Sequence, residues 1–253
     1  MNPILVTGGT GTLGRVVVDR LRNAGREVRI ASRREQPSGP AKSYTVDYDT
    51  GAGLDAAVAG TSAIVHCASA ARGDLAVTKK VIEAARAEDV HFVYISIVGA
   101  ERVPFGYYRT KLAAEKVIEN SGLPWTILRT TQFHNLVHSI LDFSAKSPLM
   151  PVLAGSFQPI GVGEVADRLA ELAMQPAAGR VPDMAGPEVR TLIDMAHVYL
   201  KSSGRHRVIV PVWLPGAAFR AFRNGGLVEP DRAVGRLTFE DFLSERAATA
   251  GKH

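Results

Sequence analysis

Short apolar runs alternate with longer amphipathic segments along the first half of the chain. The apolar runs predict strands at residues 4–6, 28–31, 44–46, 63–66, 92–96 and 125–129. The segments between them predict helices at residues 12–24, 54–58, 74–87 and 107–120. Because strands separated by helices pair in parallel through right-handed crossovers, this pattern predicts an α/β fold with a doubly wound parallel sheet.

The alternation of strands and helices loosens after about residue 130. Residues 133–145, 162–174 and 237–246 still read as helices, but prolines interrupt much of this part. We therefore expect residues 1–150 to form the sheet domain and residues 151–253 a small irregular lobe, interleaved with the sheet. Such a lobe would lie at the carboxyl edge of the strands, where open α/β sheets bind their ligands.

Composition narrows the class of protein. The chain has 253 residues, 46% of them hydrophobic, a net charge of +5 and a single cysteine. No apolar run approaches the roughly 20 residues that span a bilayer, and no secretory signal precedes the first strand, so we expect a cytoplasmic protein without a membrane partner. The mild positive charge lacks a dense basic run, so no nucleic-acid partner is expected either.

The most informative segment is Ile-Leu-Val-Thr-Gly-Gly-Thr-Gly-Thr-Leu-Gly at residues 4–14. An apolar strand meets a glycine cluster, and a helical pattern follows at once. Glycines let a backbone approach a diphosphate closely, and a helix N-terminus offers free N–H groups to the anion. The segment thus predicts a dinucleotide site rather than a purely structural turn. Its expected contacts are Gly8, Thr10, Gly11, Thr12, Leu13 and Gly14.

The end of the second strand indicates which dinucleotide binds. Ser32, Arg33 and Arg34 follow the glycine turn by about 20 residues, where an acidic residue selects NAD and a basic one selects NADP. A guanidinium matches phosphate oxygens, so we predict NADP(H). The alternative is that Arg33 is an ordinary loop arginine and that Glu35 binds the ribose.

Two further groups of residues follow strands of the same sheet. Asp47 and Tyr48 follow the third strand and are expected at the adenine, although Asp47 could instead cap the turn before residue 54. Cys67, Ala68 and Ser69 follow the fourth strand and are expected to contact the cofactor beside the diphosphate. No metal site is expected.

Candidate chemistry lies on the helix that follows the fifth strand. Tyr107 and Lys111 are four residues apart and share a helix face, so the ammonium can lower the phenol pKa and hold the cofactor ribose. Tyr107 then serves as the proton donor in a hydride transfer. Tyr108 is a rival for that role, and Ser96 is a candidate to orient the substrate oxygen. The alternative is a packing tyrosine beside a surface lysine.

These segments together resemble the short-chain dehydrogenase/reductase superfamily, and most of all its NmrA-like, NAD(P)H-binding branch. The resemblance rests on residues 7–14, 95–100, 107–115, 121–129 and 235–243. It implies a Rossmann fold, NADP(H) and a small C-terminal substrate lobe. One departure is Ile97, which stands where many relatives have a second serine and cannot donate a hydrogen bond.

The resulting prediction is an NADP(H)-dependent oxidoreductase that reduces a small apolar carbonyl, enone or quinone. The alternatives are a non-catalytic NADP(H)-binding redox sensor, motivated by Ile97, and a sugar-nucleotide epimerase or dehydratase. The sequence does not decide whether the chain forms a homodimer. One set of apolar residues in the second half is expected to form either a substrate pocket or ordinary core: Phe133, Leu136, Val152, Trp213, Leu214 and Phe219.

Overall fold

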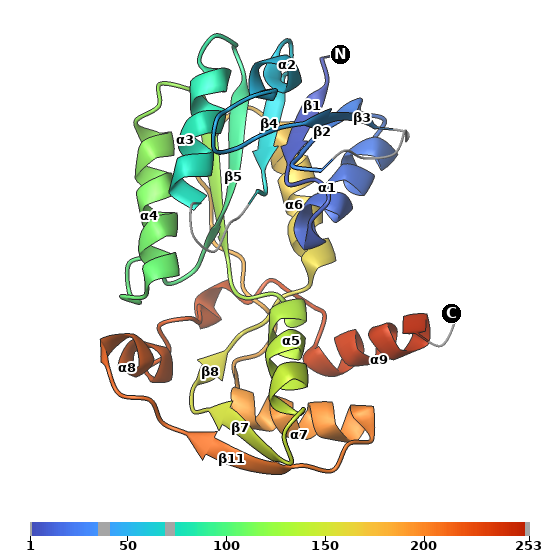
Figure 1. Cartoon of the computed structure of the whole chain (residues 1–253), viewed down its shortest axis with the longest axis vertical. Helices are drawn as coiled ribbons and strands as arrows, with labels where there is room; N and C mark the ends of the chain where they lie inside the picture. The colour runs from blue at the N-terminus through green and yellow to red at the C-terminus, as the bar shows by residue number, and fades with distance from the viewer. Residues whose placement is uncertain (1, 35–40, 69–73, 251–253) are drawn as a thin grey trace. The chain divides into compact units, whose positions relative to one another are not determined.

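A computed structural model of the chain describes residues 2–34, 41–68 and 74–250. The chain divides into two compact units (Figure 1). Unit 1 comprises residues 1–96, 106–129 and 162–182, and unit 2 comprises residues 97–105, 130–161 and 183–253. The units are more interleaved than a boundary at residue 150 implies, because residues 162–182 return to the sheet after the chain has entered unit 2.

Unit 1 is built on a seven-stranded sheet. Its order is β3-β2-β1-β4-β5-β6-β9, and β1 pairs in parallel with both β2 and β4. The strands are β1 (Ile4–Thr7), β2 (Val28–Ser32), β3 (Lys42–Thr45), β4 (Ala63–His66), β5 (His91–Ile97), β6 (Trp125–Thr130) and β9 (Gly179–Arg180). The order reverses direction at β1, so the predicted doubly wound Rossmann-like sheet is confirmed.

Helices cover both faces of this sheet. On one face α1 packs against α6, and on the other α3 lies between α2 and α4 (Figure 1). Their bounds are α1 (Thr12–Asn23), α2 (Leu54–Val58), α3 (Asp74–Ala85), α4 (Gly106–Glu119) and α6 (Val162–Ala173). The inner side of α1 is apolar at Val17, Val18 and Leu21, as a helix on a buried sheet requires.

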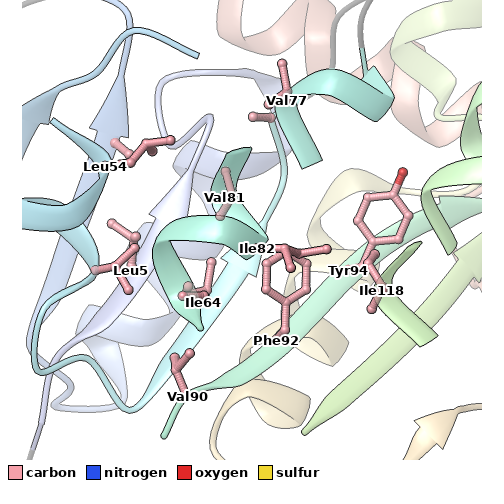
Figure 2. Packing of buried hydrophobic residues seen from close by; sticks show 14 of the residues in the cluster. Leu5, Leu54, Ile64, Val77, Val81, Ile82, Val90, Phe92, Tyr94 and Ile118 are labelled. Carbon is pink, nitrogen blue, oxygen red and sulfur yellow. The ribbon is translucent and has the colours of Figure 1, made fainter. Parts of the chain in front are cut away.

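The side chains of the core beneath α2, α3 and α4 change from apolar to polar toward the carboxyl ends of the strands. Leu5, Ile64 and Phe92 lie in register on β1, β4 and β5 and pack against the aliphatic side chains of α3 (Figure 2). Two residues further along, the same face carries Thr7, His66 and Tyr94, all fully buried. A polar layer therefore lies on this face at the carboxyl ends of the strands, where ligands of such sheets bind.

A second buried polar contact joins α4 to β6. The guanidinium of Arg129 donates to both carboxylate oxygens of Glu115, and both side chains are buried. This fork-to-carboxylate geometry satisfies both charges in a place that water does not reach. It fixes α4 against the sheet one helical turn beyond Lys111.

Unit 2 consists of short strands and helices joined by long connections. It contains two two-stranded sheets, in which β8 pairs with β10 and β7 pairs in parallel with β11. The strands are β7 (Leu149–Leu153), β8 (Ser156–Phe157), β10 (Arg190–Thr191) and β11 (Val208–Val212). The helices are α5 (His134–Ser144), α7 (Leu192–Ser203), α8 (Ala217–Arg223), the 3-10 helix η1 (Pro230–Arg232) and α9 (Phe239–Ala250).

The apolar residues of unit 2 that were expected to form a pocket or core differ in their exposure to solvent. Val152 is buried core, whereas Leu136, Trp213 and Leu214 are exposed. The β7–β11 sheet packs against α5 and α7 on one side, and apolar side chains such as Leu149 and Val208 are exposed on the other. In the part of the chain that the structure describes, no helix is long and apolar enough to cross a bilayer.

Candidate nucleotide-binding and catalytic site

The turn between β1 and α1 has the geometry that an anion site needs. Gly8 has a φ of +64°, and the N–H of Gly11 donates to Gly8 O at 2.9 Å. A Cβ on Gly14 would lie 2.2 Å from Gly8 O, so the turn closes only around glycine. The N-cap residue Gly11 offers no side-chain cap, and the first turn of α1 holds no acidic residue. The helix N-terminus is therefore left for a phosphate, and a dinucleotide diphosphate fits these residues.

The end of β4 lies directly against this turn. A Cβ on Gly8 would lie 2.8 Å from both the Cα and the N of Ala68, so the two backbones touch. Cys67 continues the pairing with β1 by donating its N–H to Thr7 O at 3.2 Å. The structure thus brings Cys67 and Ala68 beside the glycine turn, whereas Ser69 lies outside the described residues.

A buried hydrogen-bonded chain starts at the same turn. Thr7 Oγ1 lies 2.7 Å from His66 Nδ1, and His66 Nε2 lies 3.1 Å from Thr78 Oγ1. The other contacts of the two hydroxyls set the direction. Thr7 Oγ1 accepts the Ala68 N–H at 3.3 Å, and the Thr78 hydroxyl donates to Asp74 O at 2.8 Å. Thr78 is then the acceptor from Nε2–H, and in a neutral His66 the Thr7 hydroxyl is the donor to Nδ1.

The surroundings of His66 keep it neutral. Its ring lies between Phe92 and Tyr94, with centroids 5.5 and 5.6 Å away. Burial, partly opposed by Asp74 and reinforced by Lys111, lowers the pKa of His66 to about 4. Sequence reasoning placed His66 at the end of β4 but did not identify this role. The available signal was a histidine that ends an otherwise apolar strand.

The chain leads to a buried ion pair between α3 and α4. Lys111 Nζ lies 2.9 Å from Asp74 Oδ2, and the side chains are 5% and 0% exposed. The ammonium also donates to Ile95 O at 3.2 Å and lies 4.8 Å from the Tyr94 ring centroid. Burial alone would lower the pKa of Lys111, but Tyr94, Tyr107 and Asp74 outweigh it and raise that pKa. Lys111 is therefore a charged ammonium, and Asp74 is a functional candidate that sequence reasoning missed.

The two tyrosines of α4 differ in access to solvent. The ring centroid of Tyr107 lies 5.9 Å from Lys111 Nζ, and this ring is only partly buried. Tyr108 is buried and meets Tyr107 edge-on, with centroids 5.9 Å apart. Tyr107 and Lys111 thus share a helix face as predicted, and Tyr107 is the more accessible phenol.

Ser96 is buried at the end of β5, on the same sheet face as Tyr94. Among the described residues, its Oγ has no hydrogen-bond partner. An unpartnered buried hydroxyl is costly, and a bound polar ligand would satisfy it. Its orienting role stays a prediction.

The residues expected to select the cofactor lie at the end of β2. Ser32 Oγ accepts the Arg34 N–H at 3.2 Å and donates to Arg34 O at 2.8 Å, so this hydroxyl holds the turn. Arg33 and Arg34 are exposed. Glu35, the alternative ribose ligand, lies outside the described residues, and the discrimination between cofactors stays a prediction.

Asp47 and Tyr48 make contacts within the protein. Asp47 Oδ1 accepts the N–H groups of Asp49 at 2.8 Å and Thr50 at 3.2 Å, and these bonds lower the carboxyl pKa. Asp47 thus caps the turn that precedes α2. A contact of Asp47 with adenine stays a prediction. The buried Tyr48 hydroxyl donates to Ala31 O at 3.2 Å, and burial raises the pKa of Tyr48 to about 12. Tyr48 thus braces the end of β2.

Cys67 has no sign of a reactive thiolate. Although this residue is partly exposed, the low-dielectric surroundings of its sulfur raise the thiol pKa to about 12, against a smaller opposing effect of Lys111. A thiol with such a pKa is protonated at neutral pH and is a poor nucleophile.

The sequence is similar to those of known NAD(P)H-binding proteins and reductases. A sequence model described as NAD(P)H-binding matches residues 8–169. Quinone oxidoreductase 2 of Escherichia coli (strain K12) is 27% identical over 220 residues, which cover 80% of this chain and 75% of the relative. The (4-alkanoyl-5-oxo-2,5-dihydrofuran-3-yl)methyl phosphate reductase of Streptomyces griseus is 30% identical over 202 residues, covering 74% and 69%.

The fold also matches solved structures. An NADPH-dependent quinone oxidoreductase from Escherichia coli, crystallised with NADPH, superposes with a TM-score of 0.81 at 20% identity. The match covers 96% of this chain and 99% of that one.

Because His66 is neutral in the folded protein, stability should depend on pH. An unfolded histidine has a pKa of about 6.5, so between about 4 and 6.5 the unfolded chain binds the extra proton. The free energy of unfolding should therefore fall as the pH drops through this window, by up to about 3 kcal/mol from His66. Urea unfolding across the window measures this. A His66→Gln variant, which keeps all other titrating groups, should show a flatter dependence, and an unchanged slope in that variant would contradict the assignment.

Proposed function

Because the chain belongs to the NAD(P)H-binding family, we propose that it is an NADP(H)-dependent oxidoreductase. The proposed reaction reduces a small apolar carbonyl, enone or quinone by hydride transfer. Two relatives support this class, since one is named as a quinone oxidoreductase and the other as a reductase of a dihydrofuranone phosphate. The observation that carries the proposal is the unbroken series of contacts from the glycine turn through Thr7, His66 and Asp74 to Lys111.

Residues at the ends of several strands of unit 1 would bind the cofactor. The glycine turn and the N-terminus of α1 would bind the diphosphate. Arg33 would donate hydrogen bonds to the 2′-phosphate that distinguishes NADPH from NADH. Cys67 and Ala68 would offer backbone contacts where they adjoin Gly8. NADPH, when bound, supplies a hydride from its nicotinamide ring.

The residues of α4 would supply the proton. As hydride reaches the acceptor, negative charge develops on the acceptor oxygen, and Tyr107 would donate its phenolic proton there. The phenolate left on Tyr107 would be stabilised by the ammonium of Lys111, 5.9 Å from the ring, before solvent reprotonates it. The ion pair with Asp74 would hold the ammonium in place for this role, although Asp74 cancels part of its positive charge. Ser96 would orient the acceptor oxygen.

A redox sensor is the second candidate, and a specific observation favours it. Ser96 and Lys111 are both about 4% exposed, so Tyr107 alone of the three catalytic candidates has substantial access to solvent. With Ile97 in the second serine position, a sensor would bind NADP(H) through the same turn without turnover. Tight NADPH binding with no reduction of any quinone, enone or carbonyl would favour this alternative.

Arg33→Ala should weaken NADPH binding about tenfold while leaving NADH binding nearly unchanged. A charge-assisted hydrogen bond to phosphate contributes about 1.5 kcal/mol or more, and NADH has no 2′-phosphate to lose. Calorimetric titration with both nucleotides measures this. Arg86→Ala, which removes an equal charge from an exposed site beyond α3, is the matched control. Equal weakening of both nucleotides by Arg33→Ala would argue against the 2′-phosphate contact.

Tyr107→Phe should lower kcat for NADPH-dependent reduction of a small benzoquinone by about a hundredfold, because it removes only the proton donor. NADPH affinity should stay unchanged, since the ring remains. Tyr108→Phe is the control, as this buried neighbour packs edge-on against Tyr107. Loss of activity in the control alone would transfer the role to Tyr108. Full activity in both variants would exclude a tyrosine proton donor.

A further inference from the structure

The outward side of the β7–β11 sheet in unit 2 presents a row of apolar side chains. Leu149 pairs with Val208, and Pro151 pairs with Val210. Leu149, Val208 and Trp213 are 61%, 63% and 66% exposed. We call the four strand residues on this side, together with Trp213 directly after β11, the β11 face: Leu149, Pro151, Val208, Val210 and Trp213. Large side chains exposed side by side indicate an interaction surface, whereas scattered ones do not.

Basic residues flank both ends of the β11 face. Near Val208, the guanidinium of Arg207 donates to Ala145 O at 2.8 Å, and Lys146 lies 5.5 Å from the ring of Phe143, which is itself 74% exposed. Near Trp213, Arg223 donates to Leu214 O at 3.0 Å, one turn beyond Arg220 on α8.

The two chain segments that build this region contain no carboxylate. Neither residues 143–163 nor residues 195–228 include an aspartate or a glutamate. Their lysines and arginines are Lys146, Lys201, Arg205, Arg207, Arg220 and Arg223. Only Arg205 forms an ion pair among the described residues, with Asp142. The region therefore combines an uncompensated positive charge with an exposed apolar surface.

We propose that the β11 face binds the surface of an anionic lipid bilayer. Lysines and arginines around an apolar strip attract lipid phosphates, while the apolar side chains enter the headgroup boundary. Trp213 suits that boundary, because an indole has an apolar body and one N–H donor. The expectation of no membrane partner rested on the lack of a spanning segment, and binding at the surface does not require one.

Two observations disfavour a second copy of the chain on this face. Two such surfaces would bring cations together with no carboxylate to neutralise them. The open edge of β11 is also a poor template for strand addition. The N–H of Val208 and the carbonyl of Val212 point toward β7, so Pro211 points to the free edge and offers no donor there.

A nucleic acid is also a poorer match than a bilayer. Most contacts to a nucleic acid are made by polar groups to phosphate and sugar. The exposed side chains of Leu149, Val208 and Val210 would find no partner there.

Cosedimentation with vesicles tests the proposal. The protein should bind phosphatidylcholine vesicles that contain phosphatidylglycerol at low salt, bind pure phosphatidylcholine far more weakly, and be released at high salt. Loss of one basic residue beside an anionic membrane weakens binding about fivefold, so Lys146→Gln/Arg220→Gln should weaken it about 25-fold. Lys79→Gln/Lys116→Gln, which removes two exposed lysines of unit 1, should change it little.

The fluorescence of Trp213 gives a second readout. The chain has two tryptophans, and Trp125 is packed against the core of unit 1. Vesicles should shift the emission to the blue, and Trp213→Phe, which keeps an apolar ring, should abolish the shift. No vesicle binding, or equal weakening in both double variants, would overturn the proposal. A dimer that forms without lipid, and whose stability Lys146→Gln/Arg220→Gln alters, would also overturn the proposal. The β11 face would then join two copies of the chain. The assay needs neither NADPH nor turnover, so its outcome is independent of the proposed activity.

Discussion

The buried ammonium of Lys111 is the constraint on which the rest of unit 1 depends. A charged amine that is almost inaccessible to solvent requires an anion and further polar contacts, or it loses its proton. Asp74 at the start of α3 supplies the anion, and the Ile95 carbonyl supplies a second acceptor. This pairing fixes α3 against α4 at the carboxyl ends of the strands. Burial in the same polar layer keeps the His66 imidazole neutral, because it lowers the pKa of that ring to about 4.

The polar layer that results connects the two parts of the proposed chemistry. At one end, Thr7 is the last residue of β1, directly before the glycine turn that would bind the diphosphate. At the other, Lys111 lies under the partly exposed ring of Tyr107. Thr7 and Thr78 contact the two ring nitrogens of His66, and Thr78 and Lys111 both donate to Asp74, so hydrogen bonds link β1 to α4. These contacts thus connect Lys111, which lies near the Tyr107 ring, to the turn that would hold the cofactor.

Local patterns were enough to predict the sheet, the glycine turn and the Tyr107–Lys111 pair. Each depends on residues close in sequence, as a strand run, a turn or one helix face. The roles of Asp74 and His66 were missed because they depend on which side chains the parallel register brings to one face. Asp74 reads as the first residue of a helix, and His66 as the last of an apolar strand. The small sheets of unit 2 were not predicted for a similar reason. β7 pairs with β11 across more than 50 residues, and the strands β8 and β10 are too short to give a sequence pattern.

The most direct test of the central claim is the protonation state of His66, measured by nitrogen-15 NMR of its ring nitrogens. The account predicts a neutral ring with the proton on Nε2 at neutral pH, and no titration until the pH falls well below the usual histidine range. A proton on Nδ1 alone would reverse the hydrogen bonds to both Thr7 and Thr78, and a charged ring near neutral pH would reverse the bond to Thr7. Either result would contradict the ordered path from the glycine turn to Lys111.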